Sequence, residues 1–119
     1  MGFREHLQST CKSCEGALAC SLMGVDGIEV DTYVEGGGDL DVKSLLVEYS
    51  GLFRSAREAA EAQAAGGIVE LCVESEKVLT VARLVSPEYY LVVALSPGGN
   101  LGKARYLLRV TAPRLRSEL

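Results

Sequence analysis

The first third of the chain carries one helical pattern followed by two strand patterns. Residues 3–14 place apolar side chains at helical spacing, and residues 16–23 form a compact apolar segment. The Asp26-Gly27 pair then predicts a hairpin turn that leads into a strand over residues 28–34. The less polar positions of this strand alternate with polar ones and are Ile28, Val30, Thr32 and Val34. We therefore expect one buried face and one wet face, as on an outer strand.

The middle of the chain is expected to be one long helix. Residues 41–65 repeat apolar side chains at helical spacing, and this stripe comprises Val42, Leu45, Leu46, Tyr49, Phe53, Ala56 and Ala60. Asp39 or Asp41 can cap its start, and the Gly66-Gly67 pair ends it. Alanines occupy both inward and outward positions in its second half, which gives a flat surface that another helix can approach closely.

Three strands and a final helix complete the pattern. The strands are predicted over residues 68–74, 77–84 and 89–96, and short links between them indicate hairpins. Residues 89–96 are apolar at nearly every position, so both faces of this strand must be covered, and we place it at the centre of the sheet. Asn100 can cap a last helix over residues 101–119.

The element order is thus α-β-β-α-β-β-β-α. It predicts an α/β (α+β) fold in three layers, α/β/α, around a five-stranded antiparallel sheet. A chain of 119 residues fits a single domain, residues 1–119, because two separate cores would each be too small to be stable.

Charge and hydropathy narrow the class of partner. A net charge of −4 argues against a general affinity for nucleic acid or an anionic membrane, because phosphate contacts need a surplus of Lys and Arg. The longest apolar stretch falls far below the ~20 residues that a membrane helix needs. No signal peptide is visible, so we expect a cytoplasmic protein with reduced cysteines.

The cysteines are the first candidates for chemistry. Cys11 and Cys14 form a C-x-x-C motif, but a zinc site commonly takes two closely spaced pairs, and the second pair is missing. Cys20 and Cys72 lie in the middle of predicted strands among apolar neighbours, where unreactive buried cysteines are found. A redox motif would open a helix, whereas this one closes a helix. We expect no metal.

The remaining motifs give no catalytic site. Residues 97–104 imitate a phosphate-binding loop, but Pro97 replaces its first glycine, and Ala104 replaces the Ser or Thr that would hold Mg²⁺. The single histidine, His6, lies on a terminal helix, is expected to face solvent, and has no evident acid or nucleophile partner. We expect no enzyme activity and no cofactor.

Two surfaces remain as candidates for binding proteins. The first hairpin tip is more apolar than an exposed turn needs to be, and its candidate partner contacts are Val25, Asp26 and Ile28; Val25 could equally fold back onto the first helix. The strand over residues 68–74 has no strongly polar face, and as an edge strand it would pair with a copy of itself. With the long helix beside it, it predicts a two-fold homodimer. The expected interface residues are Leu46, Tyr49, Phe53, Ala56, Ala60, Val69, Leu71 and Val73.

These features resemble the roadblock / dynein light-chain superfamily across nearly the whole chain. The resemblance is carried by the element order and three motifs, which are Glu15-Gly16-Ala17-Leu18-Ala19, Asp26-Gly27-Ile28 and Gly99-Asn100-Leu101-Gly102-Lys103-Ala104-Arg105. Residues 76–87 and 109–119 look most like the Mgl group, bacterial polarity proteins that partner a Ras-like GTPase.

The resemblance implies a homodimer with a continuous sheet, and a scaffold or regulator of a small GTPase that often joins another roadblock protein. No extended tail follows the last helix, which favours an adaptor over a direct GTPase-activating protein. We therefore expect a non-catalytic homodimeric adaptor in a polarity or motility system, bound to another roadblock protein or a response-regulator-type partner. The alternatives are a small-ligand-sensing module and a metal or redox protein built on the cysteines.

Overall fold

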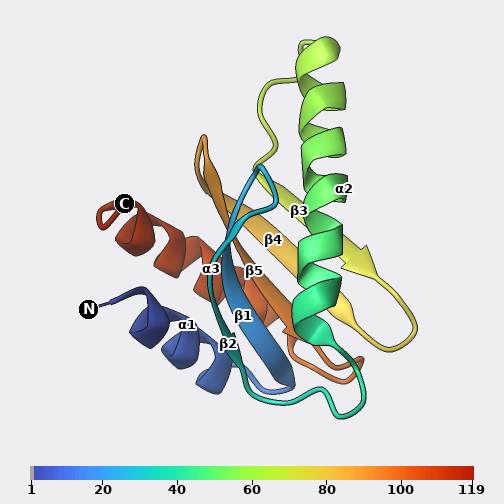
Figure 1. The fold of residues 1–119 in the computed structure, drawn as a ribbon, viewed down its shortest axis with the longest axis vertical. Coiled ribbons are helices and arrows are strands. Elements are labelled where there is room, and N and C mark those ends of the chain that lie inside the picture. Colours follow the sequence, from blue (N-terminus) through green and yellow to red (C-terminus); the bar gives the residue numbers. More distant parts are fainter. Residues whose placement is uncertain (1) are drawn as a thin grey trace.

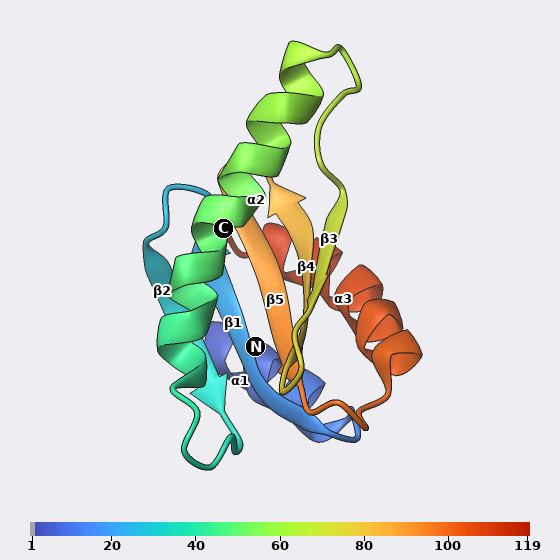
Figure 2. The ribbon, with the colours of Figure 1, turned by 90° about the vertical axis from the view of Figure 1, so that its right-hand side faces the viewer.

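The computed structural model, which describes residues 2–119, has the predicted order of three helices and five strands (Figure 1). The elements are α1 Phe3–Lys12, β1 Ala17–Gly24, β2 Glu29–Val34, α2 Val42–Ala62, β3 Glu70–Glu74, β4 Leu79–Ser86, β5 Tyr89–Leu95 and α3 Leu101–Arg116. The predicted three-layer α/β/α fold is confirmed, because α1 and α3 lie on one side of the sheet and α2 lies on the other (Figures 1 and 2).

The five strands form one antiparallel sheet in the order β2-β1-β5-β4-β3. β5 lies at the centre, as its apolar sequence predicted, and six of its seven residues are buried. β2 and β3 are the two edges. The edge position of β3 is the one that the predicted interface requires.

Two hydrophobic cores lie on opposite faces of the sheet. The core beneath α1 and α3 includes Leu7, Leu91 and Leu108, each with no exposed surface. The core beneath α2 is built around Leu46, Phe53 and Tyr90. The Phe53 and Tyr90 rings stack with 4.4 Å between their centroids and 9° between their planes. This stack joins α2 to β5.

The ends of α2 follow local chemistry. The Asp41 carboxylate accepts a hydrogen bond from the Ser44 amide at 3.1 Å and so caps the first turn. The predicted helix was too long at its other end, since α2 stops at Ala62. Ala64 has a positive φ of 56°, a left-handed conformation that interrupts the helix before Gly66.

The expected burial pattern of β2 is wrong. Ile28, Val30 and Val34, which were predicted to face the core, are 68%, 41% and 50% exposed. Thr32 is the buried member of that set, at 7%. Since α2 lies mainly over β1 and leaves the flank of β2 open, apolar spacing in this strand does not mark a core face.

Replacing Gly16 by alanine is expected to reduce the free energy of unfolding by about 3 kcal/mol. Gly16 has a φ of 85°, and an added Cβ would lie 2.4 Å from the Gly99 Cα. Left-handed backbone costs an L-residue about 1–2 kcal/mol, and the collision of the added Cβ with the Gly99 backbone adds to it. Urea unfolding should be compared with Gly66→Ala, since Gly66 has a φ of 86° but open space around it. Equal losses in the two variants would show that the contact with Gly99 contributes nothing.

Candidate protein-binding surfaces

The α2 side of the sheet is only partly covered. α2 packs mainly over β1, β2 and β5, and β3 extends beyond it (Figure 2). Lys43 of α2 reaches Glu29 of β2 at 3.3 Å, so the opposite flank of the helix faces β3. That flank carries Leu45, Tyr49, Leu52, Ala56 and Ala60. An open apolar corner therefore lies between this flank and β3.

Exposure identifies which predicted interface residues belong to this corner. Among the predicted interface residues, Val69 is 60% exposed, and those that are partly buried are Tyr49, Ala56, Ala60, Leu71 and Val73. Leu46 and Phe53 are 1% exposed, so they belong to the core of the chain and have no surface to offer a partner.

Leu52, which the sequence prediction omitted, is 47% exposed on the corner flank of α2. Its spacing of three from Tyr49 and seven from Leu45 is the signal that could have found it. The sequence predicts one apolar stripe on α2, but the helix carries two adjacent apolar faces. One face packs on the core, and the other borders the open corner.

The hairpin tip between β1 and β2 is well ordered by its own backbone. The Gly24 and Gly27 amides bond within the turn, and the Asp26 carboxylate accepts a hydrogen bond from the Ile28 amide at 3.0 Å. The Val25 amide donates to the Glu88 carbonyl at 2.9 Å and ties the tip to the turn before β5. Ile28 is held in this rigid turn with 68% of its surface exposed.

Val25 does not fold back onto α1. It packs against the core beneath α2, and with Asp26 it lines a surface hollow whose other side carries Arg54 and Arg57. A second hollow, on the other side of Asp26, is lined by Ile28, Val30 and Tyr89 among others. The structure thus brings Val25, Asp26 and Ile28 together at one projecting site with a hollow on each side.

Three of the four cysteines are buried. Cys11, Cys14 and Cys20 lie in the core beneath α1 and α3. Burial raises the pKa of Cys11 to about 11, and it raises the pKa values of Cys14 and Cys20 as well. A thiol with a raised pKa is a poor nucleophile at neutral pH. Within residues 2–119, no group of three or more His, Cys, Asp or Glu side chains is placed to hold a metal ion.

Two expectations about single residues are wrong. Cys72 is exposed at the β3 edge, because an edge strand has a neighbour on one side only. His6 is buried at 7% exposure, with its Nε2 atom 3.4 Å from the Glu118 carboxylate. It lies in α1, on the opposite side of the sheet from α2 and the open corner (Figure 1).

The loop before α3 is occupied by its own cap. The Asn100 side chain accepts a hydrogen bond from the Lys103 amide at 3.0 Å. An amide that would face a phosphate is therefore already bonded. Across residues 2–119, no helix is long and apolar enough to cross a membrane.

The sheet order β2-β1-β5-β4-β3, with α1 and α3 on one face and α2 on the other, defines a roadblock-type fold. The crystal structure of MglC from Myxococcus xanthus is 55% identical in sequence, with a TM-score of 0.74 and full coverage of both chains. The chain belongs to the MglC family of the roadblock superfamily.

More distant structures share the fold. A roadblock/LC7 domain from Streptomyces avermitilis has a TM-score of 0.84 at 14% identity and covers 99% of this chain and 98% of its own. The gliding protein MglB from Thermus thermophilus has a TM-score of 0.82 at 16% identity, with 98% and 89% coverage. No protein-family model and no curated protein sequence matches the chain.

Proposed function

We propose that this protein is a non-catalytic, homodimeric adaptor in a Ras-like GTPase polarity or motility system. It acts in the cytoplasm. There it binds another roadblock protein or a response-regulator-type partner, and it contacts the GTPase directly or through that partner. The 55% identity to MglC and the fold shared with the gliding protein MglB support the motility setting. The observation that carries the proposal is the pairing of two separate apolar surfaces on one small domain, the open corner and the hairpin tip.

The open corner is the homodimer surface. Apolar side chains of α2 and β3 meet there beside a free strand edge, so a second copy can extend the sheet and pack its own α2 at the same time. The contact is isologous, because each copy offers the same strand and the same helix. Val69, at 60% exposure, and Leu52, at 47%, are the most exposed apolar side chains that dimerisation would cover.

The hairpin tip is the surface for the second protein. It lies on the β1–β2 side of the molecule, away from β3, so it stays accessible in the dimer (Figure 2). A rigid turn loses little conformational entropy on binding, and the exposed Ile28 side chain with the adjacent Asp26 carboxylate supplies one apolar and one charged contact. Two tips on one dimer give the adaptor two equivalent docking points.

Ile28→Asp is expected to weaken capture of the partner about 100-fold while the dimer and the fold are kept. A charge at the centre of an apolar contact loses its hydration and gains no counter-charge, which costs about 2–5 kcal/mol. Partners are captured from a lysate of the source cell and identified as a roadblock protein or a Ras-like GTPase, and affinity for the purified partner is then measured by calorimetry.

The matched control is Val34→Asp, an equally drastic change at a residue of β2 that is 50% exposed but lies at the far end of the strand from the tip. Equal binding by Ile28→Asp and the unmodified chain would remove the tip from the proposal. A chain that captures neither class of partner would overturn the adaptor function.

A further inference from the structure

β2 is an edge strand with the properties of a strand-pairing site. Its six residues contain no Lys, Arg or Pro, and Val30 and Val34 expose apolar side chains. Exposed apolar edges recruit further strands unless something protects them. A chain that uses β3 for pairing needs its other edge closed, because two open edges would allow copies to add without limit.

The middle of this edge is the Thr32 amide. The Glu35 amide donates to the Leu18 carbonyl at 2.7 Å, so it points toward β1. Amides alternate in direction along an antiparallel strand, which directs Tyr33 and Asp31 toward β1 and Thr32 away from it. Thr32 therefore presents its N–H where an added strand would pair.

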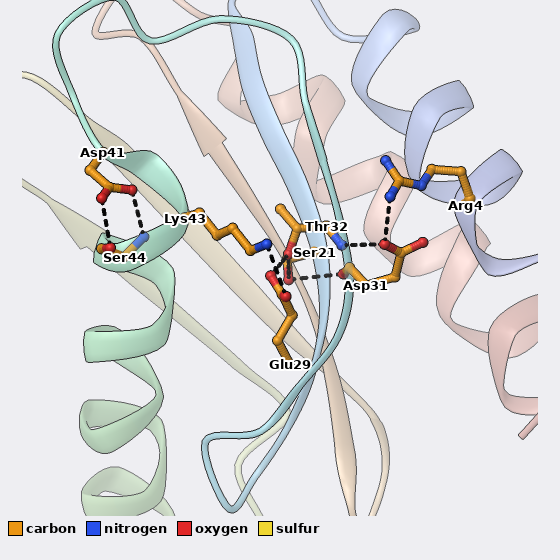
Figure 3. Close-up of polar contacts among 8 residues, drawn as sticks. All are labelled: Arg4, Ser21, Glu29, Asp31, Thr32, Asp41, Lys43 and Ser44. Carbon is orange, nitrogen blue, oxygen red and sulfur yellow. Dashed lines mark hydrogen bonds and ion pairs between the residues drawn. The ribbon is translucent and has the colours of Figure 1, made fainter.

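That N–H is already bonded within the chain. The Asp31 Oδ1 atom accepts the Thr32 amide at 2.9 Å and also accepts the Arg4 guanidinium of α1 at 2.9 Å (Figure 3). The carboxylate thus takes the donor that an incoming strand needs. It also places negative charge where the carbonyl of that strand would lie. Arg4 fixes the carboxylate in this position.

The opposite face of β2 is fastened in the same way. The Thr32 hydroxyl bonds to the Ser21 hydroxyl of β1 at 2.7 Å and to the Glu29 carboxylate, which Lys43 of α2 approaches at 3.3 Å (Figure 3). The register between β1 and β2 also shifts between Leu22 and Met23, so Val30 is an extra residue in the edge. Such a bulge twists an edge away from straight pairing.

β3 has no such protection. Its backbone pairs with β4 on one side, and within residues 2–119 no side chain forms a hydrogen bond to the backbone of Glu70–Glu74. The two edges of the sheet therefore differ. On β2 a carboxylate of the same chain accepts a hydrogen bond from an outward backbone amide, and on β3 no carboxylate of the described residues does.

We propose that Asp31, positioned by Arg4, closes the β2 edge to strand addition, so that a second copy or an extended peptide can pair with the sheet only at β3. This goes beyond the proposed adaptor function, because it explains why assembly through the sheet stops at a pair. The proposal concerns the β2 edge alone, so its test is separate from that of the adaptor function.

The test is Asp31→Ala, with mass measured by light scattering over a range of protein concentrations and amide exchange followed by NMR. We expect the Thr32 amide to exchange about tenfold faster or more, because a hydrogen bond to a charged group is lost. We also expect species larger than those of the unmodified chain, with the Val34 amide gaining protection as they form. Asp31→Asn keeps an acceptor oxygen and should stay close to the unmodified chain.

Two further variants separate edge opening from loss of stability. Glu35→Ala removes a neighbouring carboxylate that bonds to Tyr33 and should leave assembly unchanged. Adding Val34→Lys to Asp31→Ala should restore the original mass, because an edge lysine blocks pairing. The proposal is overturned if Asp31→Ala matches Glu35→Ala in mass, even if Thr32 exchange rises, or if the lysine fails to reverse the larger species. Neither outcome depends on whether the unmodified chain is a dimer.

Discussion

Replacing Leu52 by aspartate is expected to convert the proposed homodimer into a folded monomer. Leu52 is 47% exposed in the single chain, so the charge costs little there. In the proposed dimer the same carboxylate would be buried between two helices with no counter-charge. Each copy would contribute one such carboxylate. An unpaired buried charge costs several kcal/mol, so we expect the dimer dissociation constant to rise about 100-fold or more. Analytical ultracentrifugation measures it directly.

The control for this prediction is Val47→Asp on the same helix. Val47 is 39% exposed, but it lies on the flank of α2 near Lys43 and β2, away from the open corner. Its substitution should leave the dissociation constant unchanged within about threefold, as expected for an exposed site away from the contact. A monomeric Val47→Asp variant, or a dimeric Leu52→Asp variant, would show that the helix pairs through a different face.

Phe53→Ala is expected to have the largest effect on stability, a loss of about 3–5 kcal/mol in the free energy of unfolding. The ring is 1% exposed and stacks on Tyr90 at 4.4 Å between centroids. Its removal leaves a cavity beneath α2 and takes the stacking partner from a buried tyrosine, whose pKa burial raises to about 12. Small domains of marginal stability tolerate few losses of this size.

Urea unfolding at a single protein concentration, in the monomeric Leu52→Asp background, separates this loss from any effect on dimerisation. Val47→Ala, on the exposed flank of the same helix, is the control and should cost less than about 1 kcal/mol because Val47 is already 39% exposed. A small loss for Phe53→Ala would place Phe53 at the interface, as its sequence pattern first indicated.

The candidate surfaces could be predicted from sequence only in part. The tip residues Val25, Asp26 and Ile28 could be proposed from the sequence because a turn signal is local, and apolar residues in a turn are unusual; their binding role stays a prediction. The corner was found less well, since Leu46 and Phe53 were assigned to it and Leu52 was omitted. Helical spacing shows that residues share a face, but which face meets the sheet depends on the crossing of the helix over the strands.

By itself the sequence determined the element order, the central position of β5 and the three layers, because spacing, turn residues and continuous apolar runs are local properties of the chain. Only the tertiary structure decided the exposure of Ile28, Val30 and Val34, the burial of His6 and the difference between the two sheet edges. Each depends on a partner far away in sequence, as the Asp31 carboxylate depends on Arg4, 27 residues before it. Local sequence thus determines the sheet and the helices, while the candidate binding surfaces depend on where α2 stops covering the sheet.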